Sequence, residues 1–216
     1  FHDVAERFSP CRPESEVGRL MRAERGPAVV SDDLAEVLGV RVAVEVRSGG
    51  AVGLRGHRED GQPDPTGVGM GWSVERAAAI LAAAGIDRFF ISAGGDVLLR
   101  GGQEPGLPWR VGVAHPLVSE AVALVLQGQD YAVASSRIIE RGLHISDGLT
   151  GAMADELLSV TVVGTELGRA DAYATAAFAM GVEGLRWVDA LPGYAAAGIT
   201  HHARLNSTRG HDRYRV

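Results

Sequence analysis

The stretch Leu157-Leu-Ser-Val-Thr-Val-Val163, followed by Gly168-Arg-Ala-Asp-Ala-Tyr-Ala-Thr-Ala-Ala-Phe-Ala-Met180, carries the clearest structural pattern of the chain. Its first part is mostly apolar and β-branched, which is typical of a buried strand. Its second part is rich in alanine and other small residues, and Gly181 follows it as a stop signal. The stretch therefore predicts a buried strand that leads into a closely packed helix.

Helices are predicted before this stretch. Ser31 is a suitable N-cap, Asp32 and Asp33 match the positive end of the helix dipole, and Ser48-Gly-Gly50 ends the helix. One apolar stripe is expected on it, made by Leu34, Val37, Leu38 and Val42. A second helix is expected to begin at Ser73 and end at Gly85, with its inward face made by Val74, Ala77, Ala78 and Leu81.

Strand patterns dominate the rest of the chain. The segment 88–99 is strand-like but is interrupted by Gly94-Gly95-Asp96, and further strands are predicted at 109–114, 121–126, 131–135 and 194–199. Helices first and mostly strands afterwards indicate a mixed α+β domain and not a doubly wound sheet.

Composition excludes several classes of function. The 216 residues, 46% of them hydrophobic, can bury one large core or two small ones. A net charge of −6 argues against a nucleic-acid binder, and the single Cys11 excludes an intramolecular disulfide and a cysteine-based zinc cluster. No apolar stretch approaches the ~20 residues that span a bilayer.

The N-terminus says little about the cellular compartment. The sequence starts at Phe1 without an initiator Met or a signal peptide, so we expect it to begin inside a longer chain. A cytoplasmic location is slightly favoured, and the alternative is an extracytoplasmic protein anchored to the membrane. The sequence does not indicate an oligomeric state.

Asp171 and Thr175 are the first candidate for a functional site. They are four residues apart, so on a helix they share one face, and such oxygens suit a hard cation such as Mg²⁺. The nearby segment His144-Ile-Ser-Asp147-Gly-Leu-Thr150-Gly151 places an imidazole where it could serve acid/base chemistry. The alternatives are a dipole-matching Asp, a packed Thr and a structural His.

Three other motifs each allow a functional and a structural interpretation. Gly94-Gly95-Asp96 lets the backbone approach a ligand, or forms a bulge with a solvated carboxylate. The glycine-rich segment 66–71 before Ser73 is an anion site at a helix N-terminus, or a flexible connection. Ser135-Ser136-Arg137 suits phosphate but is also ordinary in a loop. In the tail, His201, His202 and His211 are expected on a solvated terminus.

The order of these motifs resembles that of the ApbE family, the FAD:protein FMN transferases. The segments that carry the resemblance are Phe8-Ser9 with Arg12-Pro-Glu-Ser-Glu16, Gly71-Trp-Ser-Val-Glu-Arg-Ala77, Ala93-Gly-Gly-Asp96, Pro108-Trp-Arg-Val-Gly112, 144–151 and 170–181. The resemblance implies an ApbE-like, T-fold-related α+β domain with antiparallel sheets and flanking helices. It would span residues 1–200 as one domain, shortened relative to the family, with a polar tail at 201–216.

The resemblance also implies an activity: Mg²⁺-dependent transfer of FMN from FAD to a threonine hydroxyl of a partner flavoprotein, with release of AMP. Asp171 and Thr175 would ligate Mg²⁺ together with a backbone carbonyl at Gly69, and His144 would be the general base. The residues that would bind the flavin nucleotide are Glu16, Met70, Gly94, Gly95, Asp96, Ser135, Ser136, Arg137, Asp147, Thr150 and Gly151.

The chain departs from the family pattern at several positions. Met70 stands where the family has Lys, and Arg137 stands where it has Gly. Further departures are Met21, Val52 and Gly148, and a segment of several dozen residues that usually follows position 53 is largely missing. Two alternatives therefore remain beside an active transferase. One is an FAD carrier, or an FAD pyrophosphatase that produces FMN and AMP, and the other is an interaction protein that has lost the ligand.

Overall fold

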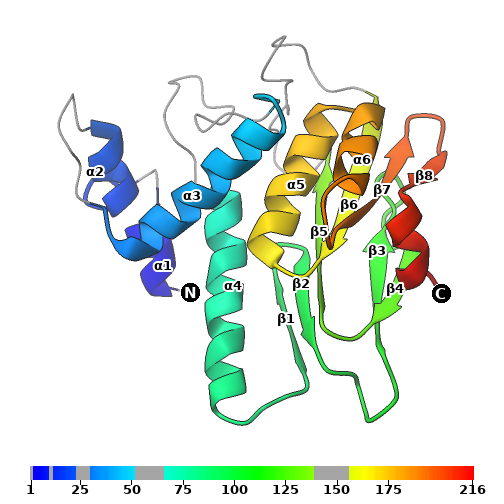
Figure 1. Cartoon of the computed structure of the whole chain (residues 1–216), viewed down its shortest axis with the longest axis horizontal. Helices are drawn as coiled ribbons and strands as arrows, with labels where there is room; N and C mark the ends of the chain where they lie inside the picture. Colours follow the sequence, from blue (N-terminus) through cyan, green and yellow to red (C-terminus); the bar gives the residue numbers. More distant parts are fainter. Residues whose placement is uncertain (1, 10–11, 23–29, 52–65, 139–155) are drawn as a thin grey trace.

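The computed structural model describes residues 2–9, 12–22, 30–51, 66–138 and 156–216 (Figure 1). Its elements, in chain order, are α1 (His2–Arg7), α2 (Glu16–Arg22), α3 (Asp32–Arg47), α4 (Thr66–Ala83), β1 (Phe89–Ala93), β2 (Asp96–Arg100), β3 (Trp109–Ala114), β4 (Val122–Gly128), β5 (Tyr131–Arg137), β6 (Leu157–Gly164), α5 (Leu167–Ala179), α6 (Val182–Asp189), β7 (Ala195–Thr200), β8 (Leu205–Ser207) and the 3₁₀ helix η1 (Arg209–Tyr214).

The strands form one large sheet and one small sheet. The large sheet has six strands in the order β1-β2-β5-β6-β7-β8, and β3 and β4 form a separate two-stranded sheet. All pairings are antiparallel. Helices α5 and α6 lie on one side of the large sheet, and α4 and α3 lie beside α5 (Figure 1). The predicted mixed α+β class with antiparallel sheets is confirmed.

Both faces of the central strands are covered. On β5, Ala132 and Ala134 belong to the apolar cluster shared with the helices, whereas Tyr131 and Val133 belong to a second cluster that they share with β3 and β4. The same alternation holds along β6, where every residue is buried. Because neither face of β6 is exposed to water, its sequence is mostly apolar on both faces, although the sheet is antiparallel.

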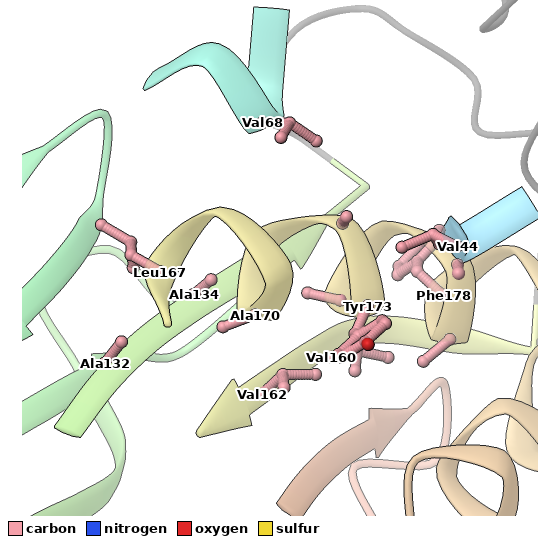
Figure 2. Packing of buried hydrophobic residues seen from close by; sticks show 14 of the residues in the cluster. Val44, Val68, Ala132, Ala134, Val160, Val162, Leu167, Ala170, Tyr173 and Phe178 are labelled. Atoms are coloured by element: carbon pink, nitrogen blue, oxygen red, sulfur yellow. The ribbon is translucent and has the colours of Figure 1, made fainter. Parts of the chain in front are cut away.

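Helix α5 packs against these strands through its small side chains. Ala170, Ala174 and Ala177 are fully buried, and Figure 2 shows α5 lying along β5 and β6 with Ala170 among the strand residues. Short side chains let the helix axis come close to the sheet and to the neighbouring helix. The prediction of a buried strand followed by a closely packed helix is therefore confirmed.

Helix α3 begins as predicted, but its buried stripe differs. The Ser31 hydroxyl accepts a hydrogen bond from the Leu34 amide at 3.2 Å, so Ser31 is the N-cap. Val37 is buried, whereas Val42 remains 42% exposed and Val44 is buried in its place. The stripe advances by seven residues from Val37 to Val44, which keeps it on one side of the helix.

Helix α4 begins seven residues before Ser73, at Thr66. The prediction of a glycine loop that forms an anion site before Ser73 is therefore wrong. Ser73 lies inside the helix, and its hydroxyl donates to the Gly69 carbonyl at 2.7 Å. The glycines serve packing instead: a β-carbon on Gly71 would lie 2.5 Å from Cα of Gly168 on α5. Close contact between the two helix backbones compensates for the low helix propensity of glycine.

The C-terminal residues pack onto the fold. The prediction of a solvated terminus is wrong for His211, which lies on η1 and is fully buried. The ring of Tyr214 packs against that of Tyr131 on β5, with 5.5 Å between centroids. His201 and His202 are exposed, as predicted. Within the described parts of the chain, no helix is long and apolar enough to cross a membrane.

Candidate active site

Predicted site residues from four elements meet at one place in the fold. Met70 lies on α4, Asp96 starts β2, Ser136 lies near the end of β5 and Thr175 lies on α5. Pairwise contacts link them in a series: Met70 approaches the Gly94 turn, Asp96 bonds to β5, and Ser136 contacts Thr175. Segments that are far apart in the sequence are thus brought together on the helix-covered side of the sheet.

Gly94 and Gly95 form the two-residue turn between β1 and β2. Ala93 pairs with Asp96, and both glycines have positive φ, 61° and 94°. Such a turn requires a conformation that glycine adopts without strain, so the alternative of a β-bulge is wrong. The Met70 sulfur lies close to this turn, because a β-carbon on Gly94 would be 2.7 Å from it. Both glycines are otherwise exposed.

Asp96 is not simply a solvated carboxylate. Its Oδ1 accepts a hydrogen bond from the Ser135 amide at 3.1 Å, just beyond the pairing of Val97 with Val133. The side chain therefore takes the place of a ladder acceptor at the end of β2 and fixes β5 next to the glycine turn. The carboxylate is partly exposed, which leaves it accessible from solvent.

The three residues Ser135, Ser136 and Arg137 do not act as one group. Side chains alternate along a strand, so Ser136 faces the helices while Ser135 and Arg137 face the other side. The Ser135 hydroxyl accordingly contacts the Thr161 hydroxyl of β6 at 2.9 Å. On the helix side, this stretch thus contributes the Ser136 hydroxyl, while the Ser135 amide donates to Asp96 of β2.

Thr175 and Asp171 lie on a helix that is otherwise almost entirely buried. Within α5 only Arg169, Asp171 and Thr175 are partly exposed. The Thr175 hydroxyl lies 3.3 Å from that of Ser136, and either group can donate. If Thr175 donates this hydrogen bond to Ser136, its lone pairs are available to a cation, and Asp171 adds a carboxylate from the preceding turn of the same face.

Gly69 is placed differently from the other proposed ligands. It is buried inside α4, and its carbonyl accepts the hydrogen bond from the Ser73 hydroxyl. In the described residues, no three His, Cys, Asp or Glu side chains gather. A cation at this place would therefore depend on Asp171, on Thr175 and on oxygens of the substrate. This fits Mg²⁺, which often takes one or two carboxylates together with phosphates and water.

Glu16 lies outside this series of contacts. Its carboxylate accepts from Arg7 Nε and from the Ser31 amide, both at 3.0 Å, and so connects α2 with α1 and the start of α3. Burial alone would raise the pKa of Glu16, but the hydrogen bonds from Ser31 and Arg7 outweigh it and leave the pKa lowered. The structure thus places Glu16 in a network that joins helices.

Glu75 has a structural role that no pattern in the sequence predicts. Glu75 of α4 accepts a hydrogen bond from the Gly168 amide at 3.2 Å, and it also accepts from Leu167. It thereby caps α5 from a neighbouring helix, since the N-cap residue Glu166 makes no side-chain cap bond. Burial raises the pKa of Glu75, although the two amide hydrogen bonds lower it in part.

Several predicted residues lie outside the described part of the chain. The general base His144 and the nucleotide-binding candidates Asp147, Thr150 and Gly151 fall in the segment 139–155. Their roles stay predictions. The same holds for the departures Val52 and Gly148, and for the side chain of Met21.

Comparison with known proteins decides the family. Residues 53–197 match the ApbE family model. The chain belongs to the ApbE family. Curated relatives include the FAD:protein FMN transferase of Vibrio cholerae, 32% identical over 56% of this chain, and that of Escherichia coli K12, 31% identical over 63%. These matches span only 39% and 42% of the relatives' own lengths.

Solved ApbE structures share the fold over almost the whole chain. The flavin transferase ApbE from Vibrio cholerae superposes with a TM-score of 0.85 at 20% identity, covering 99% of this chain and 87% of that one. The ApbE protein from Thermotoga maritima gives a TM-score of 0.86 at 22% identity, covering 99% and 88%. The expected ApbE-like α+β fold is therefore confirmed.

Proposed function

We propose that this ApbE-family chain is a magnesium-dependent transferase that moves FMN from FAD to a threonine hydroxyl of a partner flavoprotein and releases AMP. The family supports flavin transfer as the general activity. The proposed dependence on magnesium is supported by the pair Asp171 and Thr175, which are partly exposed on one face of α5 beside Ser136.

The bond changes define what the site must do. The threonine oxygen forms a new bond to the phosphorus of the FMN half, and the bond from that phosphorus to the bridging oxygen breaks. AMP leaves with the bridging oxygen, and the hydroxyl proton passes to a base. We assign that base to His144, since an aliphatic hydroxyl is hardly ionised at neutral pH and a positioned imidazole typically contributes ~10²–10⁴-fold.

Asp171 and Thr175 would hold the cation. When bound there, Mg²⁺ supplies positive charge that stabilises the pyrophosphate oxygens as the bond to the leaving group breaks. Ser136 would orient the Thr175 hydroxyl by accepting a hydrogen bond from it. A ligand role for the Gly69 carbonyl requires the Ser73 hydroxyl to share or release that oxygen, so the proposal rests on Asp171 and Thr175.

The glycine turn and β5 would hold the nucleotide. Gly94 and Gly95 are exposed at the turn between β1 and β2, where the absence of side chains lets a ligand approach the backbone. Asp96 lies beside this turn and can accept from ribose or amide groups. Arg137 offers charge on the opposite face of β5, so it would reach phosphate only around the end of the strand.

A direct test mixes the protein with FAD, Mg²⁺ and a flavoprotein that carries an acceptor threonine. The expected result is a fluorescent acceptor band that survives denaturing electrophoresis, with AMP released in equal amount. Asp171→Ala should abolish the band, whereas replacing the acceptor threonine with alanine should remove it without affecting FAD binding. AMP release without a labelled acceptor would contradict transfer and show a pyrophosphatase.

The FAD carrier is the second candidate, and one observation favours it. Met70 replaces the family's Lys with an uncharged side chain and lies against the Gly94 turn. Position 70 therefore contributes no positive charge to phosphate chemistry. A carrier would be isolated yellow, release intact FAD on denaturation and form no AMP.

A further inference from the structure

Two helices carry the proposed site, and they meet at one crossing point. On α4, Met70 lies against the glycine turn. On α5, Gly168 lies at the crossing, and Asp171 and Thr175 follow it by one and two turns along the helix. The position of the cation ligands relative to the nucleotide turn is therefore set by how α5 is held against α4.

Glu75 accepts a hydrogen bond at this crossing. It lies one helical turn after Gly71, so the two residues share a face of α4. Gly71 contacts the backbone of Gly168, while the Glu75 carboxylate accepts from the amide of the same residue at 3.2 Å. The glycine contact limits the distance between the helices, and the directional hydrogen bond limits the sliding and rotation of α5.

From this geometry we infer that Glu75 is a positioning residue, which sets the position of Asp171 and Thr175 by capping the first turn of α5 from α4. The inference rests on the proposed function for its cation. Glu75 does not touch the site itself: it acts through the Gly168 and Leu167 amides. Loss of the bond leaves the start of α5 without a side-chain cap, because Glu166 provides none.

Two conservative variants separate the effect of side-chain length from that of side-chain charge. Glu75→Gln keeps the length and one acceptor oxygen, so it should bind cation almost as the wild type does. Glu75→Asp keeps the charge but is shorter by one carbon–carbon bond, ~1.5 Å, which moves its oxygens away from the amides. Glu75→Asp and Glu75→Ala should therefore weaken binding roughly 10–100-fold, as loss of a group that orients metal ligands commonly does.

The measurement is a titration of each folded variant with Mn²⁺, without and with saturating FAD, followed by electron paramagnetic resonance and compared with Mn²⁺ and FAD in the absence of protein. Glu36→Ala is the matched control. It also removes a carboxylate that accepts a hydrogen bond from α4, from Trp72 Nε1 at 3.0 Å, but it joins α4 to α3 and not to α5. Amide hydrogen exchange at Gly168 gives an independent readout and should accelerate in Glu75→Ala and Glu75→Asp only.

The outcomes separate this inference from the proposed function. Weaker Mn²⁺ binding in the Asp and Ala variants, with wild-type binding in the Gln variant and in Glu36→Ala, supports the positioning role. Equal binding in all five proteins overturns it while leaving the cation site intact. No Mn²⁺ binding by the wild type in either titration overturns the cation site of the proposed function, and the inference falls with it.

Discussion

Gly71 of α4 and Gly168 of α5 touch through their backbones. A β-carbon on Gly71 would lie 2.5 Å from the Cα and 2.6 Å from the nitrogen of Gly168. Distances this short cannot be relieved by a side-chain rotation, because the obstructing atoms belong to the main chain of the other helix. The pair therefore fixes the closest approach of the two helices that frame the candidate site.

Gly71→Ala should destabilise the protein, because the added methyl group forces the two helices apart. Overpacking of this kind typically costs about 1–3 kcal/mol in the free energy of unfolding. Chemical denaturation followed by circular dichroism measures the change. Gly39→Ala is the control: it lies on α3 with nothing within 4 Å of the new β-carbon, so it should stabilise by about 0.5–1 kcal/mol. Equal effects at the two glycines would contradict the packing argument.

Replacing the Thr175 hydroxyl should weaken cation binding, with little change in packing. Thr175→Val removes the oxygen at almost constant volume, whereas Thr175→Ser keeps it and should bind Mn²⁺ almost as the wild type does. Ser136→Ala removes the group that orients this hydroxyl and should cost roughly 10–100-fold in affinity, as loss of an outer partner commonly does. Wild-type affinity in Thr175→Val would rule Thr175 out as a ligand.

Met70→Lys should increase the affinity for FAD. An ammonium group beside the Gly94 turn would attract the diphosphate, and a gain of ~1.4 kcal/mol corresponds to tenfold in the dissociation constant. The gain should shrink as salt is raised, because ions screen an exposed charge. Fluorescence titration at two salt concentrations measures both effects. Met70→Gln, which adds length and polarity without charge, serves as the control, and an equal gain there would exclude the electrostatic explanation.

Acid should destabilise the protein partly through His211. Burial lowers the pKa of this imidazole, the nearby Arg215 lowers it further, and Asp212 acts in the opposite direction. The unfolded chain therefore binds a proton at a higher pH than the folded chain does. Stability from this source is present above the unfolded pKa, about 6.5, and is lost as the pH falls through the lower folded value.

Thermal unfolding between pH 7.5 and 5 tests this prediction. His211→Leu should flatten the loss of stability on the acid side, since leucine cannot take up a proton. His202→Gln, a change at an exposed position, should keep the wild-type profile. A profile of His211→Leu that falls with acid as steeply as that of the wild type would show that another group is responsible.

The parts of the fold that depend on local signals could be predicted from the sequence. The Ser31 cap, the β6–α5 stretch and the face shared by Asp171 and Thr175 each follow from a short pattern with a defined period. The start of α4 could not be predicted, because glycine is unfavourable in an isolated helix. The contact of Gly71 with Gly168 on α5, which forms only in the folded chain, compensates for this cost.

The features that the sequence did not predict depend on contacts between distant segments. Glu75 caps a helix that begins about ninety residues later. It lies 93 residues before Gly168, whose amide donates to it, so no local pattern marks its role. His211 follows a polar segment without apolar periodicity, yet η1 buries it against the sheet. Strand alternation predicts that the side chains of Ser135 and Ser136 point to opposite faces of the sheet. Which of these faces packs against α5 depends on the whole fold.

The strand order has a consequence for how the candidate site forms during folding. Asp96 meets β5 only after β2 has paired with it across some thirty intervening residues, and Thr175 meets Ser136 only once α5 has docked on the finished β5–β6 pair. Pairings between distant segments form slowly, because the entropy of closing each loop is lost before contacts compensate for it. During refolding, helical signal should therefore return early, and quenching of flavin fluorescence should mark the last kinetic phase.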